Sequence, residues 1–226
     1  MVKNNNKKQD EGLKEVEEAL TKTEQFLENH LNVVLYVIGG LIVVVLGFLG
    51  YQKYVISPKN IEAQEQMFTA QDYFSIDSFD LALNGDGVTL GFLDIIDDFG
   101  ATKAGNLAEY YAGISYLHLG EYESAISCLK KFDTDDLLLE PLAKAAIGDA
   151  YVELGKYDKA IAEYKSALDA NENDFTTPTV LVKLGAVYEQ KGEKAKALEA
   201  YEQISKKYPK STEVANVEKS IARLKQ

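Results

Sequence analysis

The chain has 226 residues, of which 46% are hydrophobic, enough for one domain with a real core and a further apolar segment. Its formal net charge of -12 argues against a general binder of nucleic acid or of anionic membranes. A single cysteine, Cys128, and two histidines, His30 and His118, exclude an intrachain disulfide, a cysteine-based metal cluster and a histidine-based metal or nucleophile site, so we expect no metal and no cofactor.

The N-terminal arm is polar. Residues 1–12, MVKNNNKKQDEG, have the low complexity that is typical of disorder. Apolar positions then recur every three or four residues, which predicts an amphipathic helix over residues 13–32. This pattern is too short to indicate a coiled coil, so we expect a cytosolic helix that lies on the membrane or on a partner.

Residues 33–51, VVLYVIGGLIVVVLGFLGY, carry no charge. As a helix they span about 28 Å, close to the hydrocarbon thickness of a bilayer. A secretory signal peptide is the main alternative, but it has an apolar region of about 7 to 15 residues near the N-terminus, followed by a cleavage site. Here a long polar segment comes first and YQKYV follows, which predicts a retained single-pass transmembrane helix.

Two further features of this segment concern its surroundings. Gly40 and Gly47 fall near one side of the span, where small residues allow another helix to dock closely; ordinary transmembrane glycines are the alternative. Five lysines precede the span, against Lys53 and Lys59 just after it, and this bias predicts a cytoplasmic N-terminus. In a bacterium the chain would then cross the inner membrane once and place its C-terminal domain in the periplasm.

The rest of the chain contains an internal repeat. Three copies are GISYLHLGEYESAISCL from Gly113, GDAYVELGKYDKAIAEY from Gly148 and GAVYEQKGEKAKALEAY from Gly185. Each has a small residue, an aromatic three positions later, a Gly at seven and an Ala at twelve. This spacing resembles the tetratricopeptide repeat, a pair of antiparallel helices, and predicts three repeats over residues 106–210.

The pattern has a physical reading. A first glycine lies where the second helix crosses the first and leaves no room for a side chain, whereas the second glycine ends the first helix in a left-handed conformation. The crossing positions are Gly113, Gly148 and Gly185, and the turn positions are Gly120, Gly155 and Gly192.

The segments on either side complete the predicted solenoid. Residues 52–105 are interpreted as a degenerate repeat and a connecting helix, with Asp77 in the place of the turn glycine. NGDG at 84–87 has the residue types of a calcium loop but lacks the ligand series of an EF-hand, so a tight turn is expected. Residues 211–226 are predicted to form a capping helix that begins at Ser211 or Thr212. The expected fold is all-α, an N-terminal transmembrane helix followed by a tetratricopeptide-repeat α-solenoid.

The first helix of each pair should line the inner face of such a solenoid. The positions from the first repeat are apolar and aromatic, and those from the later repeats are increasingly acidic, which suits a protein segment with an apolar part and a basic part. Packing against the next helix is the alternative role of these positions. The predicted groove residues are Tyr110, Ile114, Leu117, His118, Asp149, Val152, Glu153, Val182 and Glu189. Some co-chaperones with this repeat hold a terminal carboxylate with Lys and Asn, but Tyr110 and Ile114 stand at those positions here.

The order of polar arm, single span and repeat domain resembles the YfgM-type proteins, ancillary subunits of the bacterial Sec translocon, in the version found in the Bacteroidetes. The segments that carry the resemblance are NGDGVTLGFLDII, AEYYAGISYLHLGEYESAI, IGDAYVELG and VYEQKGEKAKALEAY. The resemblance implies a non-enzymatic partner of translocon subunits and of a membrane-anchored, PpiD-like chaperone that acts on newly exported proteins.

Two other functions are the alternatives. An adaptor of a different envelope complex, for specialised secretion or for division, would share the same architecture. An enzyme is not expected, because the acidic pairs Asp97/Asp98 and Asp135/Asp136 are adjacent in sequence and project in different directions from a helix. We therefore expect protein partners and no small-molecule substrate.

Overall fold

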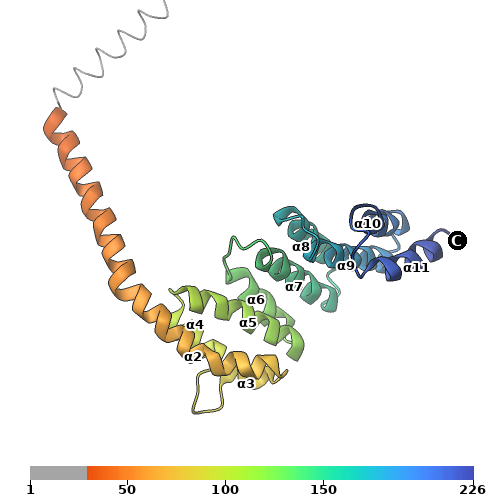
Figure 1. Ribbon diagram of the computed structural model, residues 1–226, viewed down its shortest axis with the longest axis horizontal. Coiled ribbons are helices and arrows are strands. Elements are labelled where there is room, and N and C mark those ends of the chain that lie inside the picture. The colour runs from red at the N-terminus through yellow and green to blue at the C-terminus, as the bar shows by residue number, and fades with distance from the viewer. Residues whose placement is uncertain (1–29) are drawn as a thin grey trace, which may run out of the picture. The chain divides into compact units, whose positions relative to one another are not determined.

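The computed structural model describes residues 30–226, and those residues are helical with no strand (Figure 1). The predicted polar tail, 1–12, and nearly all of the predicted amphipathic helix, 13–32, lie outside the described residues. The chain divides into two compact units, Met1–Val55 and Ile56–Gln226. The prediction of an all-α fold is confirmed.

The first unit contains the apolar segment. Residues 30–51 are α-helical, and the helix that begins at His30 is long and apolar enough to cross a membrane by its length and composition. Nearly every side chain from 33 to 51 is exposed, and no atom lies within 4 Å of a Cβ built on Gly40 or Gly47. The helix passes through a π-helical turn, η1 (Gln52–Ile56), just before Pro58, whose missing N–H interrupts the α-helical ladder.

The second unit is a series of helices. It begins with α2 (Ser57–Ser75), α3 (Phe79–Asn84) and α4 (Phe92–Phe99). Three pairs follow: α5 (Lys103–Leu119) with α6 (Tyr122–Lys131), α7 (Leu139–Glu153) with α8 (Tyr157–Ala170), and α9 (Thr176–Gln190) with α10 (Lys194–Lys207). The last helix is α11 (Val214–Leu224). Figure 1 shows the pairs following one another from green to blue.

The crossing glycines lie where the sequence places them. A Cβ built on Gly148 would lie 2.5 Å from Cε1 of Tyr164, and one on Gly185 would lie 2.4 Å from the same atom of Tyr201. In the first pair Gly113 meets the side chain of Leu129 at 2.5 Å. Each second helix therefore packs a large side chain directly onto the backbone of the first.

The turns within the pairs use left-handed residues. Gly120, Gly155 and Gly192 have φ values of 81°, 67° and 75°. Asp77, between α2 and α3, is the non-glycine residue that takes the same conformation, at φ 60°. The turn of the degenerate pair thus keeps the geometry of the others while it lacks their glycine.

Two hydrophobic clusters fill the second unit. One joins residues of α2 to α5, with Phe92, Ile95 and Met67 among its buried members. The other runs through α7 to α11 and includes Tyr164, Tyr201 and Val217. The small alanines at the helix contacts, Ala125, Ala160 and Ala197, are fully buried.

The NGDG loop can be compared with expectation. NGDG forms a turn in which the Asp86 carboxylate accepts hydrogen bonds from the backbone N–H of Val88 and Thr89, at 2.9 and 2.7 Å, and these bonds lower its pKa. Within the part of the chain that is described, no group of three His, Cys, Asp or Glu side chains is arranged to hold a metal.

The expected cap of the last helix is wrong. α11 begins at Val214 with Glu213 at its N-cap, and no side chain caps its N–H groups. The hydroxyls of Ser211 and Thr212 donate to the Glu213 carboxylate instead. The Ser211 hydroxyl oxygen also accepts from the backbone N–H of Glu213 at 3.2 Å, so this hydroxyl contacts the N-cap residue and no N–H within α11.

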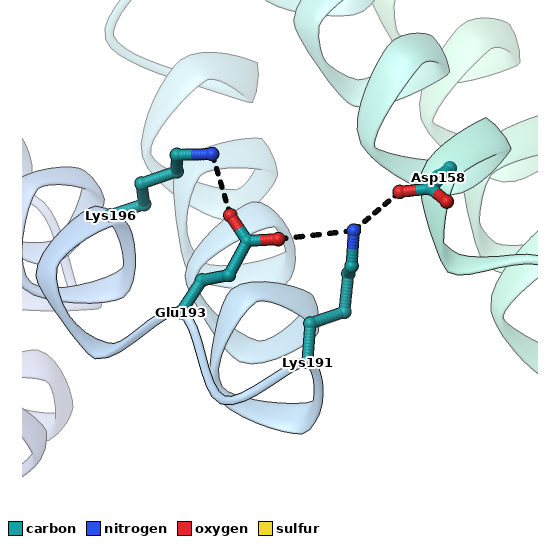
Figure 2. A network of polar contacts seen from close by, with 4 residues as sticks. All are labelled: Asp158, Lys191, Glu193 and Lys196. Carbon is teal, nitrogen blue, oxygen red and sulfur yellow. Dashed lines mark hydrogen bonds and ion pairs between the residues drawn. The ribbon is translucent and has the colours of Figure 1, made fainter.

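Polar contacts also join successive repeats. Lys191, in the turn after α9, lies between Asp158 at the start of α8 and Glu193 before α10, and Lys196 binds the other oxygen of Glu193 at 2.6 Å (Figure 2). The network connects residues about one repeat apart. It therefore adds to the apolar contacts between pairs α7/α8 and α9/α10.

Candidate protein-binding groove

A cavity of about 400 Å³ lies along the first helices of the three pairs, α5, α7 and α9. We refer to it as the groove. Five of the predicted residues line it: Tyr110, Ile114, Leu117, His118 and Asp149. Successive turns of α5 bring Tyr110, Ile114, Leu117 and His118 to one side, because residues three and four apart share a helix face, and α7 adds Asp149.

The groove has an apolar wall and an apolar rim. Tyr110, Ile114 and Leu117 are half-buried, and the Tyr110 ring packs against Phe132 with 5.3 Å between ring centroids. Burial raises the pKa of Tyr110. At the rim, Phe175 is 81% exposed and Leu142 is 39% exposed. Large apolar groups open to solvent beside a concave apolar surface are characteristic of binding sites.

His118 stands at the α5 end of the groove. Its ring stacks on Phe79 with 4.3 Å between centroids and 6° between planes. Phe79 belongs to α3, so the degenerate pair contributes to the edge of the groove. The stack fixes the imidazole as an aromatic surface of the groove.

Asp149 is the acidic residue of the groove, and its charge is balanced inside the chain. Its carboxylate accepts a hydrogen bond from the Tyr164 hydroxyl at 2.7 Å and one from Lys183, which also lines the groove. Burial, and then the negative charge of Asp149, raise the pKa of Tyr164. The middle of the groove therefore offers a paired carboxylate and ammonium to a ligand.

The other four predicted residues do not line the groove. Val152 and Val182 are half-buried and pack against the core, and Glu153 is exposed with the Tyr122 hydroxyl 3.5 Å away. Glu189 accepts from the Tyr201 hydroxyl at 2.8 Å and pairs with Arg223 of α11, also at 2.8 Å.

These contacts correct the expected charge of the inner face. The acidic positions Asp149 and Glu189 were expected to receive a basic part of a ligand, but Lys183 and Arg223 of the chain itself occupy them. Both cations lie 34 positions after their carboxylate, that is, about one repeat later. The pairing follows from the stacking of repeats, which a residue-by-residue reading of one helix does not include.

Phe175 and Lys183 are among the groove residues that were not predicted. Phe175 lies in DANENDFTTP, a polar segment between the second and third repeats, and no periodicity in that segment marks it as a groove residue. Lys183 follows Thr179 by four positions and so shares its face of α9. This four-residue spacing along α9 is the signal that could have found Lys183.

Comparison with known proteins identifies the repeats. A family model described as TPR repeat matches residues 148–192, and one described as tetratricopeptide repeat matches residues 107–134 and 179–211. A search of curated proteins found no match. The chain is similar to a solved structure titled "Crystal structure of MamA protein", with a TM-score of 0.57 and 22% identity over 72% of this chain and 80% of that chain.

The matched segments are therefore tetratricopeptide repeats. At 22% identity the likeness to the solved structure shows the fold alone. Repeats of this family generally act as non-catalytic scaffolds for protein–protein interaction, through the concave surface that the stacked helices form.

Proposed function

We propose that this protein is a membrane-anchored scaffold that binds a segment of a partner protein in the groove between α5, α7 and α9. The observation that carries the proposal is the apolar rim, where Phe175 is 81% exposed beside a cavity of about 400 Å³. A partner that covers Phe175 and Leu142 would remove their apolar surface from water, which favours binding. No catalytic chemistry is needed for this role.

The ligand that fits has one or two large apolar side chains. Tyr110, Ile114 and Leu117 provide an apolar wall, and Phe175 and Leu142 would close over an inserted side chain. The pair of Asp149 and Lys183 provides one acceptor and one donor to the ligand backbone. An extended or helical segment with an apolar anchor meets these conditions, without the basic part that the sequence suggested.

The partners we propose are subunits of the Sec translocon and a PpiD-like, membrane-anchored chaperone. Support comes from the resemblance to YfgM-type proteins and from the architecture of an apolar helix before a repeat domain. The lysine bias around the span supports a cytoplasmic N-terminus, so the repeat domain would lie in the periplasm at the bacterial inner membrane. Gly40 and Gly47 would provide the face that docks in the membrane.

The groove is tested with exposed residues, which can be changed without disturbing the core. The full-length protein is purified from native membranes as wild type and as Phe175→Asp, with Ala162→Asp on the exposed surface of α8 as a matched control. Quantitative mass spectrometry should show partners lost from the Phe175→Asp sample and kept in the control. Equal recovery in all three samples would contradict groove binding.

The membrane face is tested with photo-crosslinking side chains. One is placed at Gly40, and a control is placed at Leu49, which lies on the opposite side of the helix at about 100° per residue. Crosslinks to translocon or chaperone subunits from Gly40, and not from Leu49, are expected. Crosslinks only to another envelope complex, for secretion or division, would assign the protein to that complex instead.

A further inference from the structure

The first helix of the repeat unit, α2, has two different faces. Ala63, Met67 and Ala70 are buried at 0%, 3% and 1% exposure and pack into the cluster with α3, α4 and α5. With about 100° between successive residues, Ile61 and Phe68 lie on the opposite side of the helix, and Ile76 follows as the C-cap residue. That side faces away from the core of the unit.

The outward face of α2 is apolar, and it is exposed. Ile61, Phe68 and Ile76 are 57%, 63% and 68% exposed. Glu65 and Asp72 lie on the same face between them and are also exposed. We call these five residues the α2 stripe. An exposed helix of a soluble solenoid ordinarily carries polar residues there.

The two ends of the solenoid therefore differ. At the C-terminal end, α11 buries Val217 at 2% exposure and presents Asn216, Glu218 and Lys219 to solvent, as a terminal cap should. At the other end, α2 presents the stripe in the position where a preceding helix would pack. The chain caps one end of its repeat stack and leaves the other end open.

The end of the solenoid that carries the α2 stripe is also acidic. Residues 56–105 contain two lysines and nine acidic residues, a balance of -7. Among the described residues, every ion pair joins side chains from Glu109 onward, so Glu65 and Asp72 have no cationic partner. In the groove, by contrast, the carboxylate is already paired with Lys183.

We propose that the α2 stripe docks an amphipathic helix of a partner protein, with apolar side chains flanked by lysine or arginine. The apolar residues would pack against Ile61, Phe68 and Ile76, and the cations would pair with Glu65 and Asp72. The same stripe of a second copy does not fit, because it would set these carboxylates against the same carboxylates. An anionic bilayer surface is repelled for the same reason.

The test uses synthetic helical peptides and the full-length protein in phosphatidylcholine nanodiscs. One peptide carries leucines along one face with lysines on both flanks, and its twin has glutamate in place of each lysine. Fluorescence anisotropy should show the lysine peptide binding the wild type, and binding about tenfold or more weaker for Phe68→Ser and for Glu65→Lys/Asp72→Lys. The glutamate peptide should bind the wild type weakly and should bind the Glu65→Lys/Asp72→Lys variant more tightly.

Two controls separate this surface from others. Glu199→Lys/Glu218→Lys makes the same charge change on α10 and α11 and should keep the affinity of the wild type. Phe175→Asp changes the groove rim and should also keep the wild-type affinity for the lysine peptide. The proposal for the stripe and the proposal for the groove can therefore fail independently. The affected side chains are exposed, and circular dichroism checks that each variant is folded.

Several results would overturn the proposal. These are equal affinity for both peptides, unchanged affinity in Phe68→Ser, and loss of binding only in Phe175→Asp. Dimerisation of the wild type that Phe68→Ser abolishes would assign the stripe to a second copy. Binding to phosphatidylglycerol vesicles that depends on Phe68 would assign it to a lipid surface.

Discussion

The ring of Tyr164 lies against the backbone of Gly148, so closely that a Cβ at position 148 would stand 2.5 Å from the ring carbon Cε1. The same relationship joins Gly185 to Tyr201 in the next pair. In both pairs the tyrosine hydroxyl donates a hydrogen bond to a carboxylate on the first helix, Asp149 or Glu189. One side chain thus determines both the packing of the helix pair and the polar contacts of its inner face.

A methyl group at this contact should destabilise the protein. Gly148→Ala gains about 1 kcal/mol of helix propensity, but overpacking costs about 1 to 3 kcal/mol, so we expect a net loss of about 1 kcal/mol. Urea unfolding of the full-length protein in detergent, followed by circular dichroism, measures it. Ala162→Gly, at an exposed position of α8, is the control and should lose stability because glycine has the lower helix propensity. A Gly148→Ala variant that is more stable than the wild type would refute the close contact with Tyr164.

The hydroxyl of Tyr164 can be tested apart from its ring. Tyr164→Phe removes the 2.7 Å hydrogen bond to Asp149 and keeps the apolar contact with Gly148. We expect a loss of about 1.5 kcal/mol in the free energy of unfolding, since the bond has a charged acceptor and a buried donor. Tyr157→Phe is the matched control, because the Tyr157 hydroxyl has no hydrogen bond within the described residues; equal losses in both variants would count against the bond.

How far the sequence predicts this structure depends on whether a feature is local. The glycines at 113, 148 and 185 were interpretable because a repeated gap in side-chain volume has one simple cause, a close helix crossing. The pairing of Asp149 with Lys183 was not, since it joins residues 34 positions apart and depends on how the repeats stack. For the same reason the inner face was expected to be more acidic toward ligands than it is.

The remaining differences between the predicted and the observed structure lie next to helix starts. Ser211 and Thr212 have the side chains of helix caps, yet both donate to Glu213, which the sequence places beside them. Phe175 lies in a polar segment of irregular length, where no periodicity indicates the direction of a side chain. Both cases depend on geometry within a few residues of a helix start, where sequence patterns carry the least information.

The turn between α2 and α3 should be improved by glycine. Asp77 holds φ at 60°, a conformation that costs an L-residue about 1 to 2 kcal/mol, and its side chain makes no hydrogen bond within the described residues. Asp77→Gly should therefore raise the free energy of unfolding by about 1 kcal/mol. Gly155→Ala provides the reverse change at φ 67°, with no atom within 4 Å of the new Cβ, and should lower it. The urea midpoints should move in opposite directions; movement in the same direction would show that backbone strain is not the cause.

Stability should fall in acid partly through Glu202. Its carboxylate accepts from Lys225 and Lys206, and these bonds lower its pKa from 4.5 to about 2. A carboxyl group with a lowered pKa stabilises the folded state above the unfolded value, and this contribution is lost as the pH falls toward the folded value. The urea midpoint should therefore drop between about pH 5 and pH 2, and less steeply in Glu202→Gln. Identical slopes in the two proteins would contradict a role for this pair of ion pairs.

The most direct measurement of the central claim, that the groove binds a partner protein, places a photo-crosslinking side chain at Phe175 in the full-length protein in native membranes. The same side chain at Ala162, on the exposed surface of α8, is the control. We predict a protein adduct from position 175 that is absent from position 162 and is lost when Ile114→Asp is added in the groove. Adducts of equal identity and yield from both positions, or an adduct from 175 that persists in the Ile114→Asp background, would contradict the account.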